Sequence, residues 1–158
     1  MRVHLVEQQL TPETFCALRE KVGFQPYTRE NVAAALDKTL YTAEVRDGSR
    51  TVGIARIVGD GRIVFFIKDV AVDPGYRGKG IGRTLMEALL RYVESNACEK
   101  AYVGLMATPG TEGFYEEFGF IKRPASGLGH GMVKFVSPSR EAHTPPAGPA
   151  CRSMSRRV

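Results

Sequence analysis

A glycine-rich loop with basic side chains is the segment of the sequence best suited to chemistry. It reads Arg77-Gly78-Lys79-Gly80-Ile81-Gly82-Arg83 and lies between a β-rich run and a helical pattern. Glycine lets a ligand approach the backbone closely, and the unpaired N–H groups at the start of a helix attract anions. Because three cationic side chains add positive charge, the loop predicts a binding site for a phosphate group.

The spacing within the loop excludes two common phosphate-binding motifs. A nucleotide P-loop needs Ser or Thr directly after Gly-Lys, but Gly80 follows Lys79. A dinucleotide fingerprint needs a third small residue three positions after Gly-x-Gly, and both ways of aligning the loop put a large side chain there. The loop satisfies instead the pattern Arg/Gln-x-x-Gly-x-Gly, with Arg77, Gly80 and Gly82 at its fixed positions.

A second motif follows the loop after one predicted helix and one predicted strand. It reads Phe114-Tyr115-Glu116-Glu117-Phe118-Gly119-Phe120 and is similar to the pattern (L/F)-Y-x-x-x-G-F. With both motifs in this order, residues 3–136 resemble the GNAT superfamily of acyl-CoA-dependent N-acetyltransferases. The resemblance implies an enzyme that uses acetyl-CoA. No pair among the three cysteines has metal-ligand spacing, so we expect no bound metal.

The resemblance also implies where the cofactor binds. The strand backbone at 70–72 would pair with the pantetheine arm and the thioester carbonyl, and the loop amides would hold the pyrophosphate. Relatives often carry Asn shortly before the short helix, where Thr108 or Pro109 stands here. The predicted cofactor-binding residues are Val70, Ala71, Val72, Arg77, Gly78, Lys79, Gly80, Ile81, Gly82 and Arg83.

Acetyl transfer needs a proton for the departing thiolate and an uncharged amine. The resemblance assigns the first task to Tyr115, whose phenol has a pKa of about 10, near that of a thiol. The alternative is that Tyr115 is one more aromatic residue of the core. The candidate base is Asp69, directly before the carbonyl-binding strand, and its alternative is a structural carboxylate. Some relatives carry a strand glutamate where this chain has Phe66, and Glu44 is a weak substitute.

The acceptor pocket implied by the resemblance lies between the early helices. Phe24, Pro26 and Tyr27 fall there, and we expect Phe65 and Tyr41 nearby. Phe24, Tyr27 and Phe65 are therefore the predicted substrate-binding residues. An aromatic, weakly charged wall suits the primary amine of a small molecule with an apolar body. A protein or peptide N-acetyltransferase and a non-catalytic acyl-CoA sensor remain as alternatives.

Hydrophobic periodicity predicts the elements that must position these residues. Thr11 and Thr28 are expected to cap two helices. Further helices are expected at 81–92 and 111–118, and strands at 40–46, 51–58, 63–72, 101–106, 120–122 and 132–136. The run 63–67 is apolar throughout, which predicts a strand buried on both faces. The order of these helices and strands is that of an α+β chain. The GNAT resemblance implies one mixed sheet of about six or seven strands, flanked by about four helices. The resemblance also implies that the sheet is splayed between the two strands that hold the cofactor.

Composition sets the remaining limits. The chain has 158 residues with 43% hydrophobic and 25% charged residues, which is typical of one globular domain. Residues 138–158 contribute +3 of the net charge of +5, which leaves only +2 for the rest of the chain. The sequence therefore predicts no basic surface that binds nucleic acid. We expect an acetyltransferase domain over 1–137 and a disordered tail over 138–158. No apolar run suggests a membrane span or a signal peptide, which favours a cytoplasmic protein. A homodimer remains as an alternative to a monomer.

Overall fold

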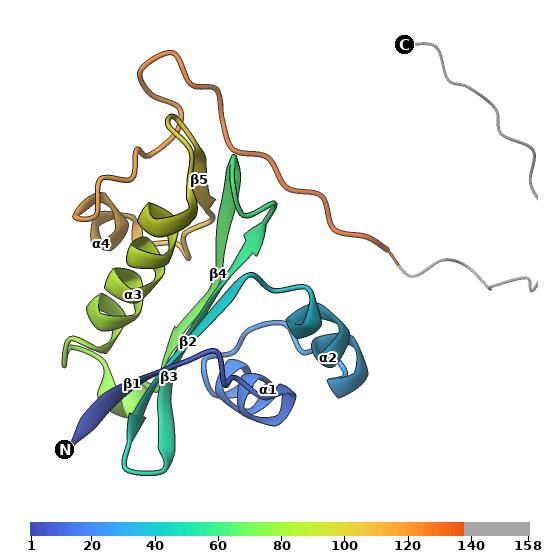
Figure 1. The fold of residues 1–158 in the computed structure, drawn as a ribbon, viewed down its shortest axis with the longest axis vertical. Coiled ribbons are helices and arrows are strands. Elements are labelled where there is room, and N and C mark those ends of the chain that lie inside the picture. The colour runs from blue at the N-terminus through green and yellow to red at the C-terminus, as the bar shows by residue number, and fades with distance from the viewer. Residues whose placement is uncertain (138–158) are drawn as a thin grey trace, which may run out of the picture. The chain divides into compact units, whose positions relative to one another are not determined.

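The computed structural model describes residues 1–137, and residues 1–120 are built on one five-stranded sheet (Figure 1). The strands lie in chain order, and all neighbours are antiparallel except the parallel pair β4 and β5. They are β1 (Val3–Glu7), β2 (Tyr41–Asp47), β3 (Arg50–Gly59), β4 (Val64–Val72) and β5 (Tyr102–Leu105). The predicted α+β fold with one mixed sheet is confirmed, and the sheet has five strands in the described residues rather than six or seven.

Helices cover both faces of this sheet. Figure 1 shows α1 and α2 on one face and α3 on the other. The helices are α1 (Pro12–Lys21), α2 (Arg29–Asp37), α3 (Ile81–Asn96) and the short α4 (Glu112–Glu116). The side chain of Thr11 accepts a hydrogen bond from the N–H of Thr14, and that of Thr28 accepts one from Asn31. Both predicted caps are therefore confirmed.

Each face of the sheet has its own apolar core. On the α3 face, Phe65 of β4 packs with Leu85 and Leu89 of α3, all three fully buried. On the other face, Phe15 of α1 packs with Ile54 and Ala71 of the sheet. Burying one such large side chain stabilises the fold by about 1.5–3 kcal/mol. These two cores fix α1 and α3 against opposite sides of β4.

The prediction that residues 63–67 are buried on both faces is wrong. Side chains alternate along β4, so Phe65 and Ile67 are buried while Val64 is exposed. Ile63, just before the strand, is exposed as well. The apolar contacts of α1 and α2 reach β4 at Ala71, and the beginning of the strand lies outside this core.

The two final strands predicted at 120–122 and 132–136 are not present. Residues from Ile121 onward belong to a second unit, which starts within the predicted domain of residues 1–137. Among the described residues of that unit, the ladder contacts amount to one isolated bridge between Ala125 and Leu128. A strand needs a hydrogen-bonded neighbour to satisfy its backbone, and alternating apolar residues alone do not provide one. The predicted tail, residues 138–158, lies outside the described residues.

No helix within residues 1–137 is long and apolar enough to cross a lipid bilayer.

Candidate functional site

A β-bulge interrupts β4 directly before the predicted cofactor-binding stretch. The β3–β4 ladder pairs Ile54 with Ala71 and Arg56 with Lys68, so two residues of β4 stand opposite one residue of β3. Asp69 occupies this bulge with a φ of +58°, a left-handed conformation that Asp tolerates better than most residues. A bulge bends its strand and re-aims the side chains beyond it.

The bulge and the short β5 together leave one edge of β4 open. Before the bulge, the side chains of Phe65 and Ile67 belong to the core on the α3 face, whereas after it Ala71 belongs to the opposite core. Among residues 1–137, β5 pairs with β4 only as far as Ile67. The backbone at 68–72 is therefore unpaired toward β5, which is the splayed gap that the GNAT resemblance implied.

The glycine loop at the start of α3 leaves a row of N–H donors unpaired. Gly78 and Gly80 have φ values of +73° and +80°, which side-chain-bearing residues adopt only with strain. A Cβ at either position would meet no atom within 4 Å, so the space above the loop is open. Within the described residues, the N–H groups of 78–83 have no hydrogen-bond partner. Such a row of donors suits an anion.

Gly82 and Arg83 have a different role from the other loop residues. A Cβ on Gly82 would lie 3.2 Å from Cζ of Phe114, so the missing side chain makes room for α4 rather than for a ligand. Arg83 forms an ion pair with Glu117, and its guanidinium lies 5.1 Å from the centroid of the Phe118 ring. These contacts hold the second motif against the first. Arg77 and Lys79, both exposed, supply the positive charge at the loop itself.

Tyr115 lies on α4 among aromatic rings. Its ring meets those of Phe114 and Phe120 edge-on, with centroids 5.1 and 6.3 Å away. Burial raises the pKa of the Tyr115 phenol above its usual value of 10.0. Its hydroxyl has no hydrogen-bond partner within residues 1–137. The phenol therefore carries its proton at neutral pH and has that proton free to donate.

The Asp69 carboxylate, by contrast, is fully engaged. One oxygen forms an ion pair with Arg19 of α1, and the other accepts a hydrogen bond of 2.6 Å from Nε of Arg56. The side chain of Asp69 is only 3% exposed. Because both oxygens are held by guanidinium groups, the geometry favours the structural alternative for Asp69 over the base. The carboxylate of Glu44 is likewise engaged, since it is buried and bound by Arg46 and Thr51.

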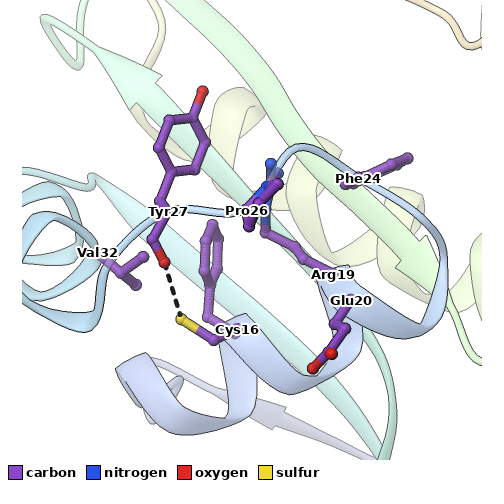
Figure 2. Close-up of a pocket in the computed structure, with 8 residues that line it drawn as sticks. Cys16, Arg19, Glu20, Phe24, Pro26, Tyr27 and Val32 are labelled. Atoms are coloured by element: carbon purple, nitrogen blue, oxygen red, sulfur yellow. Dashed lines mark hydrogen bonds between the residues drawn. The ribbon is translucent and has the colours of Figure 1, made fainter.

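A cavity of about 370 Å³ lies between α1 and the segment that leads to α2 (Figure 2). It brings Phe24, Pro26 and Tyr27 together, as the sequence predicts. The cavity is lined by Phe15, Cys16, Arg19, Glu20, Phe24, Pro26, Tyr27 and Val32. Phe65 is not among these residues: it is fully buried against α3 on the opposite face of the sheet. Tyr41 likewise belongs to that core, where it stacks on Tyr92 with centroids 4.8 Å apart.

Arg19 is the most conspicuous residue that the sequence analysis missed. Its guanidinium carbon lies 5.2–5.3 Å from the ring centroids of Phe15, Phe24 and Tyr27. It also donates a hydrogen bond of 2.6 Å to the carbonyl oxygen of Gln25. A sequence signal exists, because Arg19 follows Phe15 by four positions and so shares the buried stripe of α1.

Asp73, at the beginning of the loop, binds both α1 and the β2–β3 hairpin through its carboxylate. Hydrogen bonds from Lys21 (3.0 Å), from the N–H of Gly75 (3.0 Å) and from Arg50 (2.7 Å) lower the pKa of its carboxyl to about 2. An unfolded Asp has a pKa near 3.9. The ionised group therefore stabilises the fold above about pH 4, and this contribution is lost as the pH falls toward 2.

We predict that Asp73→Asn, which keeps the cap but removes the charge, lowers the free energy of unfolding by about 1–2 kcal/mol at pH 6, allowing for solvent screening of the partners. Urea unfolding at pH 6, 4 and 2.5 measures this. The difference from the wild type should be clearly smaller at pH 2.5 than at pH 6. A difference that is the same at all three values would contradict the ion-pair account.

Comparison with known proteins points to one family. Residues 6–120 match the acetyltransferase (GNAT) family. SA2161, a probable acetyltransferase of unknown function from methicillin-resistant Staphylococcus aureus, has a similar structure with a TM-score of 0.77 and 34% identity, over 85% of this chain and 100% of that one.

Two plant relatives with named acceptors are each 32% identical to this chain. Histone acetyltransferase TAP1 from Glycine max matches over 68% of this chain and 51% of its own length. Serotonin N-acetyltransferase 2 from Oryza sativa subsp. japonica matches over 66% of this chain and 53% of its own length. The chain thus spans about half the length of these curated relatives.

Proposed function

The chain belongs to the acetyltransferase (GNAT) family of acyl-CoA-dependent transferases, and from this premise we propose that it transfers the acetyl group of acetyl-CoA directly to the primary amine of a small molecule. The observation that carries the proposal is the continuous run from the open edge of β4 into the glycine loop. The backbone at 70–72, whose edge toward β5 is unpaired, is followed after the short 3-10 turn Pro74–Tyr76 by the unpaired N–H groups of 78–83.

These features suit the two chemically different parts of acetyl-CoA. The extended pantetheine arm is an amide chain, which an unpaired strand edge can bind as a further strand would. The pyrophosphate is an anion, which the loop N–H groups can bind together with Arg77 and Lys79. The open space over Gly78 and Gly80 leaves room for it. Acetyl-CoA supplies the activated acetyl group when bound.

Two groups of this chain would assist the transfer. The N–H of Val70, next to the bulge, would donate a hydrogen bond to the thioester oxygen as negative charge develops on it. The phenol of Tyr115 would give its proton to the departing thiolate. Neither carboxylate considered for the amine proton is free, because Asp69 and Glu44 are both bound by arginine. We therefore propose that the amine reacts in its neutral form and loses its proton to water.

The cavity beside α1 supports a small acceptor with an apolar body. Its volume of about 370 Å³ is at the lower end of the range for small-molecule sites, and four of its eight lining residues are Phe, Tyr or Pro. The serotonin N-acetyltransferase relative agrees with this interpretation. The histone acetyltransferase relative favours the second candidate, an exposed amine of a protein, which would need an open groove.

An amine panel distinguishes the two candidates. We predict that thiol release from acetyl-CoA depends on added phenethylamine and is much slower with a lysine-containing peptide at the same concentration. Release that depends on the peptide but not on phenethylamine would identify a protein acetyltransferase. Acetyl-CoA binding without release on either acceptor would contradict the proposed acceptor class and would favour the non-catalytic sensor instead.

A further inference from the structure

The aromatic wall of the cavity already holds a cation of the protein itself. Three rings that could surround a positively charged ligand instead surround Arg19, whose guanidinium carbon lies 5.2–5.3 Å from the centroids of Phe15, Phe24 and Tyr27. Aromatic faces attract cations, and the guanidinium of Arg19 already occupies these three faces. A cationic ligand in this cavity therefore finds a fixed positive charge where it would otherwise find an attractive ring.

The charge of Arg19 is only partly neutralised. Arg19, Asp69 and Arg56 form one group in which the single carboxylate is shared between two guanidinium groups, and of the three residues Arg19 and Asp69 are buried. The group as a whole carries one positive charge. The cavity has one carboxylate of its own, Glu20, which is exposed, and in Figure 2 its side chain extends away from Pro26 and Tyr27. Solvent screens an exposed charge far more than a buried one.

We propose that Arg19 is a specificity-determining residue that makes the cavity reject acceptors with a second positive charge. This inference rests on the proposed function, because it takes the cavity as the acceptor site. A monoamine can bind in its neutral, reactive form and brings no charge into the cavity. A diamine or polyamine must also place an ammonium group near the buried guanidinium, and in a low-dielectric site like charges repel strongly.

Two amines that differ by one aminomethyl group, which carries one positive charge when protonated, test the proposal. Phenethylamine and its para-aminomethyl derivative share the same aromatic body, and the quantity measured is the ratio of their kcat/KM values with acetyl-CoA. Arg19→Met removes the charge but leaves Asp69 paired with Arg56. We expect this variant to shift the ratio toward the diamine on the order of tenfold, the size expected for one unit charge about 10 Å away at the effective dielectric of a protein.

Two further variants separate charge from structure. Arg19→Lys keeps the charge and should keep the wild-type ratio, even where its stability falls. Arg29→Met removes a charge of the same sign from an exposed position that does not line the cavity, and it should leave the ratio unchanged. The ratio depends neither on how much enzyme is folded nor on how well it binds acetyl-CoA, because both amines are measured on the same sample.

The outcomes are distinct. An unchanged ratio in Arg19→Met, or equal changes in the Met and Lys variants, overturns the charge-based role while the acetyltransferase proposal stands. A wild-type preference for the diamine also overturns it. No turnover of either amine by the wild type overturns the proposed acceptor class, and this inference with it.

Discussion

Tyr115→Phe should lower kcat by about 10²–10⁴-fold, the usual contribution of general acid catalysis, with little change in acetyl-CoA affinity. The substitution keeps the ring and its edge-on contacts with Phe114 and Phe120 while deleting the transferable proton. Because the hydroxyl has no partner within the described residues, we expect almost no loss of stability. Steady-state kinetics and a thermal melt of the same two samples provide the measurement.

Tyr92→Phe is the matched control for this experiment. Tyr92 stacks on Tyr41 in the core on the α3 face and belongs to neither motif, so its variant should turn over at the wild-type rate. If Tyr115→Phe also keeps the wild-type rate on an acceptor for which chemistry limits kcat, the acid assignment is wrong.

The pH dependence follows from the same residue. Burial raises the pKa of the Tyr115 phenol above 10.0, so the acid stays protonated across the neutral and mildly alkaline range. The reactive amine, in contrast, gains its neutral form as the pH rises. We expect kcat/KM for the amine to increase from about pH 6 to 9 without a descending limb. A rate that falls at the alkaline end of this range would show that another group donates the proton.

Gly80→Glu should abolish the stabilisation of the protein by acetyl-CoA. A ligand at about 100 times its Kd stabilises the native state by about 2.7 kcal/mol, which for a chain of this size raises Tm by roughly 5–10 °C. Gly80 is the N-cap residue of α3, with open space above it. A carboxylate there places bulk and negative charge where the pyrophosphate is proposed to bind, so the rise in Tm should be lost.

A second glycine controls for the backbone strain of this substitution. Gly23, which follows α1, has a φ of +74°, and a Cβ added to it would meet no atom within 4 Å. Gly23→Glu therefore adds the same strain and the same charge away from the loop, and it should keep the full rise in Tm with acetyl-CoA. An undiminished rise in a folded Gly80→Glu variant would remove the phosphate-loop assignment.

Local features of this protein could be predicted from the sequence. The caps at Thr11 and Thr28 depend on side chains three residues from their partners. The open glycine loop likewise depends on residues within one short segment. In each case the interactions that fix the structure are close along the chain, where residue type and spacing are informative.

Features set by contacts between distant segments could not be predicted. The partner of Asp69 on α1 is 50 residues away, so nothing near Asp69 shows that its carboxylate is held rather than free. The role of Gly82 depends on the Phe114 ring. The face of the sheet on which Phe65 is buried depends in the same way on its packing against α3. The bulge in β4 is decided by the ladder with β3, which no local pattern encodes.

The proposed reaction is tested most directly by the identity and amount of its products. Acetyl-CoA labelled on the acetyl carbonyl carbon is incubated with phenethylamine, and the amide is quantified by mass spectrometry while the free CoA thiol is titrated in the same sample. Direct transfer predicts one labelled amide for each thiol released by the wild type, with both products falling together in Tyr115→Phe. Thiol release without labelled amide, or amide formation that does not depend on the enzyme, would contradict the account.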